Sequence, residues 1–198
     1  IKGAKLKSLS NIVPSNISVC NGQTVASSTF TSIPAGGTFT WTNSNPAIGL
    51  AASGTGAQSS FIATNTGTTS ITSTITVTPS VASGCPGVPG TYTITVLPTP
   101  VMSPLTNISV CQGTDIPASL FVSTVANTTF NWTNSNAVIG VATSGTGNVP
   151  LFTSTNTTTS DIFGTINVIP NLNNTCYGVP VSYTITVKPS PTISTIAN

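Results

Sequence analysis

Side chains that can do acid–base or thiol chemistry are few in this chain of 198 residues. Its acidic residues are Asp115 and Asp161, its basic residues are Lys2, Lys5, Lys7 and Lys188, and it has no histidine. General acid–base catalysis needs a group that titrates near the working pH, usually a histidine or a pair of carboxylates. We therefore expect no catalytic residue and predict that the chain is not an enzyme.

The same scarcity of charge bears on ligands and partners. Calcium prefers several oxygen ligands with more than one carboxylate, and residues 1–114 hold no carboxylate side chain. We therefore expect no metal site and no cofactor. A net charge of +2 offers no electrostatic attraction for nucleic acid, and no apolar run approaches the ~18 residues of a membrane helix. Neither nucleic acid binding nor membrane insertion is expected of this segment.

A repeat dominates the sequence. Two stretches align without a gap at an offset of 91 residues, which relates Cys20 to Cys111 and Trp41 to Trp132. The strings NISVC, WTNSN, SGTG and YTITV begin at Asn16, Trp41, Ser53 and Tyr92, and each recurs at the same offset. A unit of this length can bury its own core, so each repeat is predicted to be an independent domain.

Proline-rich joints set the predicted domain bounds. We assign residues 1–13 to the tail of a preceding repeat, 14–98 to repeat 1, 99–104 to a Pro-rich linker, 105–189 to repeat 2 and 190–198 to a linker toward a following repeat. The string LPTPVMSPLTN at 97–107 has counterparts at 6–16 and 188–198. We expect the chain to be a segment of a longer array whose neighbouring repeats are its partners.

Hydrophobic residues alternate with threonine in the strongest predicted strands. Residues 69–78 place Ile71, Ile75 and Val77 on one face, and residues 91–96 alternate in the same way. The Gly- and Pro-rich loop 81–90 joins them into a predicted hairpin. Further short strands are predicted at 17–19, 25–31, 38–42, near 48–51 and at 60–64. The pattern predicts an all-β chain of two tandem immunoglobulin-like β-sandwiches.

Most aromatic residues recur in both repeats, which favours a role in the core. Phe39 and Trp41 alternate as a sugar-binding platform would, but core packing explains their recurrence better. The predicted core of repeat 1, with counterparts 91 residues later, consists of Phe39, Trp41, Phe61, Ile75, Val77, Ile94 and Val96. Only Phe163 and Tyr177 lack an aromatic counterpart, so these are the candidates for an exposed contact. SGTG is predicted to be a tight turn, because no lysine follows it as in a phosphate-binding loop.

An ordered set of motifs carries a family resemblance. The set is NISVC, TFTWTNSN (38–45), SGTG, TNT (64–66), TITVTP (74–79) and GCPGVPGTYTITVLPTP (84–100). As a set it resembles the PKD-like repeats of very large surface proteins of Bacteroidetes, including gliding-motility adhesins. The resemblance implies an extracellular protein of the bacterial cell surface, exported by the type IX system. WTNSN replaces the WDFGDG-like stretch of ordinary PKD domains, so their calcium or glycan binding is not carried over.

Two main functions follow from this resemblance. The leading hypothesis is a spacer, in which the repeats form the shaft of a filamentous adhesin whose partners bind other parts of the protein. The alternative is a module that binds polysaccharide or a protein partner through its loops. A third hypothesis is an accessory module of a secreted polysaccharide-degrading enzyme.

Four cysteines, Cys20, Cys85, Cys111 and Cys176, occur two per repeat. The extracellular setting that the resemblance implies favours oxidation, and we predict the disulfides Cys20–Cys85 and Cys111–Cys176. A disulfide that closes a loop of this size stabilises the folded state by about 4 kcal/mol in the chain-entropy model. In a plain sandwich the first turn and the last hairpin loop lie at opposite ends, so this pairing requires the loop 81–90 to fold back. The alternative pairs Cys85 with Cys111 and leaves Cys20 and Cys176 to neighbouring repeats.

Overall fold

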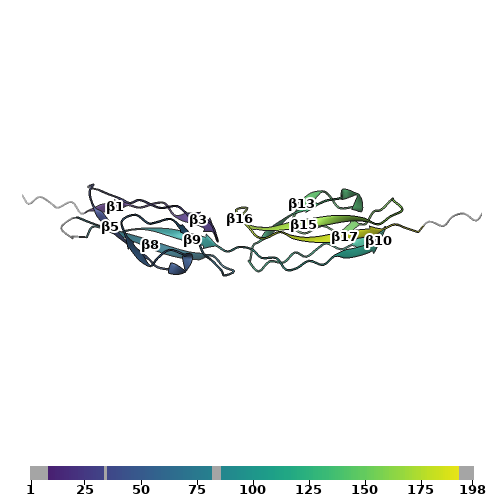
Figure 1. Cartoon of the computed structure of the whole chain (residues 1–198), viewed down its shortest axis with the longest axis horizontal. Helices are drawn as coiled ribbons and strands as arrows, with labels where there is room; N and C mark the ends of the chain where they lie inside the picture. The colour runs from purple at the N-terminus through teal and green to yellow at the C-terminus, as the bar shows by residue number, and fades with distance from the viewer. Residues whose placement is uncertain (1–8, 34, 82–85, 192–198) are drawn as a thin grey trace, which may run out of the picture. The chain divides into compact units, whose positions relative to one another are not determined.

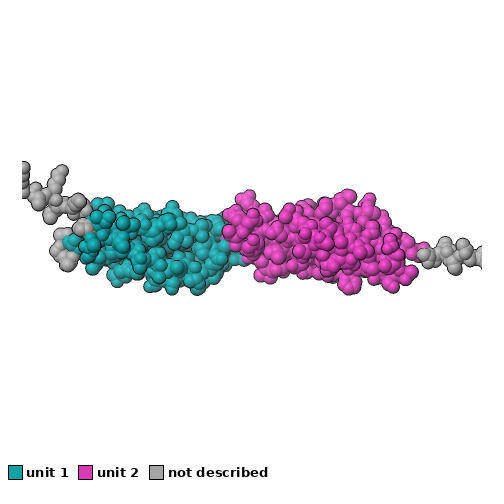
Figure 2. Space-filling model, turned by 90° about the horizontal axis from the view of Figure 1, so that it is seen from above, with its two compact units in different colours: residues 1–99 teal, residues 100–198 magenta. Residues whose placement is uncertain are grey.

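The computed structural model describes residues 9–33, 35–81 and 86–191. The chain divides into two compact units, residues 1–99 and residues 100–198 (Figure 2). Both units are β-sandwiches, which confirms the predicted all-β, immunoglobulin-like fold class. Within the described ranges, no helix has the length and apolarity needed to cross a bilayer.

Unit 1 is built on one large sheet. Its strands are β1 (Ser10–Ile12), β2 (Ile17–Cys20), β3 (Thr24–Val25), β4 (Thr31–Ile33), β5 (Thr38–Asn43), β6 (Ser53–Thr55), β7 (Phe61–Ile62), β8 (Ile71–Ser80) and β9 (Gly90–Leu97). Five strands pair in the order β2-β9-β8-β5-β6, and the pairs β1-β4 and β3-β7 form two short sheets (Figure 1). Strand β2 runs parallel to β9, whereas the other pairs are antiparallel.

Unit 2 repeats this topology. Its strands are β10 (Ile108–Cys111), β11 (Asp115–Ile116), β12 (Thr129–Asn134), β13 (Ser144–Thr146), β14 (Phe152–Thr153), β15 (Ile162–Leu172), β16 (Cys176–Tyr177) and β17 (Val181–Lys188). The large sheet has the order β10-β17-β15-β12-β13, and β16 extends it by pairing with the end of β15. Strands β11 and β14 form the short sheet of this unit.

The alternation of aliphatic residues with threonine positions the core. In β8, Ile75 and Val77 are fully buried, while Thr72 is exposed and its Oγ1 lies 3.0 Å from Oγ1 of Thr95 on β9. Trp41, Ile75, Val77, Ile94 and Val96 are buried as predicted. Phe39 and Phe61 are only partly buried and pack against this core. The predicted hairpin is confirmed, because β8 and β9 are antiparallel neighbours.

Three local predictions differ from the structure. The strand expected near 48–51 is instead a short 3-10 helix, Pro46–Ile48, whose first turn is capped by the Asn45 side chain. The segment 25–31 is split between two different pairings, β3 with β7 and β4 with β1. SGTG is not simply a turn, since Ser53–Thr55 pairs with β5 as strand β6.

Residues that the sequence assigns to the tail and the linker also take part in the fold. Ser10–Ile12, within the predicted tail, forms β1 and pairs with β4. Met102, within the predicted linker, is buried in the core of unit 2 and bridges to Ser123. The proline-rich joints therefore contribute strand pairing and apolar contacts to the units that they precede.

A glycine opposite the buried tryptophan shapes each sandwich. Gly54 on β6 pairs with Trp41 on β5, and a Cβ atom added to Gly54 would lie only 2.2 Å from Cζ2 of the indole ring. Gly145 stands in the same relation to Trp132, at 2.3 Å. The indole ring covers the backbone of the neighbouring strand, so any larger residue there would collide with it.

We expect Gly54→Ala to destabilise unit 1 by about 1 to 3 kcal/mol, the usual cost of forcing extra volume into a packed core. Urea unfolding followed by Trp41 fluorescence in a Trp132→Phe background measures this, because the chain has two tryptophans. Gly67→Ala is the matched control, since its added Cβ would meet only the Asn65 side chain, at 3.4 Å. Equal losses in the two variants would contradict the packing role of Gly54.

Candidate functional site

The charged side chains are scattered, as their spacing in the sequence indicates. Asp115 is exposed and its Oδ1 accepts a hydrogen bond from Oγ1 of Thr153 at 2.6 Å. Asp161 and Lys188 are also exposed. Among the residues that the structure describes, no three of the types His, Cys, Asp and Glu gather where they could hold a metal ion. This part of the chain therefore assembles no acid–base or metal centre.

The WTNSN motif closes a loop. Asn43 is buried, and its Nδ2 donates hydrogen bonds to the carbonyl oxygens of Leu50 at 2.8 Å and Ala51 at 3.2 Å. Its Oδ1 accepts from the backbone N–H of Asn45 at 3.0 Å. In unit 2, Asn134 bonds in the same way to the carbonyl oxygen of Val141. Both amide ends are satisfied by backbone, so the motif has a structural role.

The TNT motif works by the same chemistry. Nδ2 of the buried Asn65 donates to the carbonyl oxygens of Val96 at 2.8 Å and Thr69 at 2.9 Å. Asn156 repeats these bonds with the carbonyl oxygens of Val187 and Ser160. Asparagine amides thus supply the internal hydrogen bonds of loops in both units.

The two aromatic residues without counterparts, which the sequence singles out as candidates for an exposed contact, are both exposed. Phe163 is 62% exposed and Tyr177 is 56% exposed. Tyr177 pairs with Asn171, which lies eight residues along β15 from Phe163, a separation of roughly 26 Å in a strand. Side chains this far apart cannot form one aromatic platform for a sugar ring.

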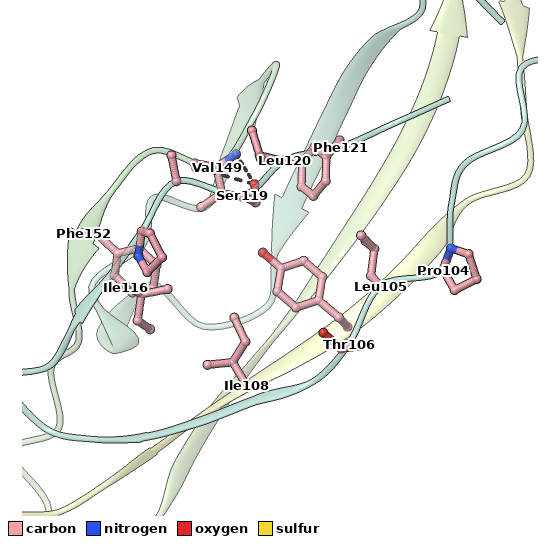
Figure 3. A pocket seen from close by; sticks show the side chains of 13 residues that line it. Pro104, Leu105, Thr106, Ile108, Ile116, Ser119, Leu120, Phe121, Val149 and Phe152 are labelled. Atoms are coloured by element: carbon pink, nitrogen blue, oxygen red, sulfur yellow. Dashed lines mark hydrogen bonds between the residues drawn. The ribbon is translucent and has the colours of Figure 1, made fainter. Parts of the chain in front are cut away.

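A concave apolar pocket of about 380 Å³ lies in unit 2 (Figure 3). Its walls include Leu105, Ile108, Ile116, Phe121, Phe152 and Tyr183. Ser119 anchors one wall, because its Oγ accepts a hydrogen bond from the backbone N–H of Val149 at 2.8 Å. Leu120, which is 80% exposed, lies at the pocket as well.

Unit 1 has a polar side chain at the position of one wall residue of this pocket. Gln58, the counterpart of Val149, is fully buried, and its Oε1 accepts a hydrogen bond from the Tyr92 hydroxyl at 3.2 Å. The recurring motifs and aromatic residues do not reveal the pocket, because most of them are the same in both repeats. The exchange of Gln58 for Val149 was the available signal.

The cysteines depart from the predicted pairing. Cys20 and Cys176 are each disulfide-bonded, whereas Cys111 is an exposed free cysteine. The predicted Cys111–Cys176 bond is therefore wrong for this structure, and so is the alternative Cys85–Cys111 bond. The remaining predicted pair includes Cys85, which lies outside the described residues. The topology of the large sheet explains the error: Cys111 ends the edge strand β10 beside Lys188, whereas Cys176 on β16 pairs with Leu172 at the far end of β15.

The family comparison supports a PKD-like repeat. Residues 17–100 match the PKD-like domain family. The match covers repeat 1, and repeat 2 carries the same motifs 91 residues later. No curated protein matches the chain.

Solved structures with the same fold contain immunoglobulin-like domains. The chain is similar to extracellular domains 3–5 of Drosophila OTK, with 13% identity and a TM-score of 0.51, over 92% of this chain and 62% of that one. It is similar to the I-band fragment I67–I69 of titin, with 10% identity and a TM-score of 0.54, over 93% of this chain and 66% of that one. It is also similar to Rst D1–D2, with 13% identity and a TM-score of 0.50, over 93% of this chain and 100% of that one. The chain spans just under two thirds of the first two structures, and these identities show the fold alone.

The buried tyrosines make stability depend on alkaline pH. Burial raises the pKa of Tyr92 and of Tyr183, and hydrogen bonds from Ser28 and Ser119 offset this only in part. A raised pKa in the folded state means that the stabilisation is complete below about pH 10, the ordinary pKa of tyrosine. It is lost as the pH rises further, because the unfolded chain releases these protons first.

We therefore expect the urea midpoint to be constant from pH 7 to 9 and to fall above pH 10. Tyr92→Phe should remove the fall in unit 1, and Tyr183→Phe should remove it in unit 2. Absorbance at about 295 nm, which reports tyrosinate, should show that the hydroxyls of Tyr92 and Tyr183 ionise later than that of free tyrosine. A fall of equal size in the double variant would contradict the assignment to these two hydroxyls.

Proposed function

We propose that the two repeats are structural spacers in the shaft of a large extracellular protein of the bacterial cell surface, of the gliding-adhesin type. The observation that carries the proposal is the use of the motifs that both repeats share. Trp41 packs over Gly54, and Asn43 and Asn65 hold loops through backbone hydrogen bonds. A repeated unit whose shared residues all serve its own folding is suited to setting length and stiffness.

The chemistry of the cysteines supports an extracellular setting. Cys20 and Cys176 are disulfide-bonded, and disulfides persist mainly in oxidising compartments outside the cytosol. The family match to PKD-like domains agrees with this setting. An origin in Bacteroidetes and export by the type IX system remain parts of the proposal, supported by the motif set.

A scarcity of protease sites suits an exposed fibre. Lysine occurs only at Lys2, Lys5, Lys7 and Lys188, and the chain has no arginine. Lys188 is followed by Pro189, whose ring removes the backbone N–H and hinders trypsin-type cleavage. A protease of that specificity therefore has no favourable site after Lys7.

The pocket in unit 2 favours the alternative function, a binding module. Its apolar walls suit one apolar side chain or a small apolar molecule better than a sugar. A polysaccharide would need several hydrogen-bonding groups, and the Ser119 hydroxyl is already bonded to the backbone of Val149. Unit 1 has Gln58 at the position of Val149, so this wall residue is not shared by the two repeats.

We expect the two-repeat chain to show no saturable binding on an array of bacterial and algal polysaccharides, because a spacer holds an adhesive domain away from the surface. The control is a known glycan-binding β-sandwich on the same array. Saturable binding that Leu120→Asp abolishes would instead support the binding module and overturn the spacer function for unit 2.

We expect trypsin to remove only the segment ending at Lys7 and to leave a single large fragment, both in buffer and in 6 M urea. Elastase, which cleaves after small residues, should leave the native chain largely intact and degrade it in urea, because protection then depends on the fold. Mass spectrometry of the digests checks both results. Rapid elastase cleavage of the native chain would argue against a protease-resistant shaft.

A further inference from the structure

Four separate segments of unit 2 surround the apolar pocket. Leu105 precedes β10 and Ile108 begins it, while Ile116 and Phe152 come from the paired strands β11 and β14. Tyr183 belongs to β17. Figure 3 shows Leu105 on one side of the pocket and Ile116 with Phe152 on the other. The pocket is therefore formed by the fold of unit 2 alone.

None of the described residues that line the pocket carries a charge. Polar atoms of one wall are bonded within the unit, since the Ser119 N–H donates to the Val149 carbonyl at 3.0 Å and the Ser119 Oγ accepts from the Val149 N–H at 2.8 Å. The Phe121 N–H likewise donates to Oδ1 of Asn148 at 3.0 Å. Such a lining favours an uncharged ligand, because a charged one would lose its hydration without gaining a partner.

Repeat 1 shows what the buried tyrosine of each unit can bond. In unit 1 the Tyr92 hydroxyl donates to the amide carbonyl oxygen Oε1 of Gln58 at 3.2 Å. The counterparts in unit 2 are Tyr183 and Val149, both of which line the pocket. A valine side chain has no hydrogen-bonding atom, so the carbonyl that Tyr92 bonds has no equivalent at that position of unit 2. A ligand with a carbonyl oxygen would supply one.

The surroundings of the pocket are more apolar than the same positions of repeat 1. Leu120 lines the pocket and is 80% exposed, and Leu151, which directly precedes the wall residue Phe152, is 65% exposed. Their counterparts in repeat 1 are the exposed Thr29 and Ser60, whose hydroxyls can bond water. An exposed leucine gains free energy when a ligand covers it, at roughly 25 cal/mol per Å² of apolar surface. The two leucines therefore favour an apolar ligand at this place.

We propose that the pocket of unit 2 binds a compact, uncharged small molecule with an apolar body and one carbonyl group. The body contacts the apolar walls, and the carbonyl oxygen accepts a hydrogen bond from the Tyr183 hydroxyl. A volume of about 380 Å³ lies within the range of small-molecule sites. The hydroxyl favours such a molecule over a leucine or phenylalanine side chain of a protein partner, because an apolar side chain would cover it without bonding it. This site is a function of unit 2 beyond the spacer role.

Titration of the full chain with acetophenone, followed by methyl NMR, tests the proposal. Acetophenone combines one aromatic ring with one carbonyl group. We expect saturable shifts of the Leu120 and Val149 methyl signals, with a dissociation constant of roughly 1 mM for a ligand of so few atoms. Benzoate, which has a similar shape and a negative charge, should cause no such shifts. Absence of saturable shifts up to the solubility limit of acetophenone, or equal binding of benzoate, would overturn the proposal.

Variants that carry the residues of repeat 1 locate the site. Val149→Gln should abolish acetophenone binding, because its amide offers the tyrosine the carbonyl that repeat 1 has. Leu120→Thr changes an exposed side chain, so it should keep the urea midpoint and weaken binding several-fold. Val138→Ala is the matched control, since Val138 is exposed, lies outside the pocket lining and has Ala47 as its counterpart. Unchanged binding in both pocket variants would contradict the assigned site.

Tyr183→Phe tests the hydrogen bond. It should weaken acetophenone binding roughly two- to tenfold, the usual contribution of a neutral hydrogen bond, and leave the binding of ethylbenzene unchanged. An unchanged affinity for acetophenone would show that the site does not select a carbonyl group.

Two further measurements separate the competing occupants. Shifts of the Leu120 signal that grow with the concentration of the chain, without ligand, would identify a second copy of the chain as the occupant and overturn the small-molecule site. Binding of a leucine- and phenylalanine-rich peptide without binding of acetophenone would overturn it in favour of a protein partner. None of these results depends on the glycan array, so failure of the spacer function is distinguishable from failure of this site.

Discussion

Contact between one indole ring and the bare backbone of a neighbouring strand organises each repeat. Trp41 is buried and lies over Gly54, and the pairing of β5 with β8 on its other side brings it beside Val77. The same arrangement recurs with Trp132, Gly145 and Val168. In a unit of this size one large aromatic side chain supplies much of the apolar area that can be buried, so the position of the other strands depends on it.

Asparagine takes over the structural tasks that charged residues perform in many proteins. Buried polar groups must be hydrogen-bonded, and an amide both donates and accepts without the cost of burying a charge. Asn43 and Asn65 each bond to backbone at both ends of the amide group, as do Asn134 and Asn156. These bonds are independent of pH and salt, which suits a module that is exposed to changing surroundings.

The strand pattern was accessible from sequence where one face of a strand is buried and the other is solvated. Residues 71–80 and 90–97 show this alternation, and the structure has β8 and β9 there. The pattern fails where a segment is short and its neighbours decide the conformation. Ile48 is fully buried from a 3-10 helix, and Ser53–Thr55 becomes a strand only because Gly54 lets Trp41 lie across it. The pocket beside Tyr183 was not predicted: the exchange of Gln58 for Val149 marks a difference between the units, but only the fold brings the several wall segments together.

Local and periodic features of the amino-acid sequence were sufficient to predict two all-β repeats and their buried tryptophans. These features depend on residue type and on spacing within one strand, which the chain itself carries. The cysteine pairing was decided by tertiary structure, because it depends on which end of a strand each thiol occupies. Cys111 and Cys176 belong to one repeat, yet they lie at opposite ends of β15, and only the strand pairing shows this.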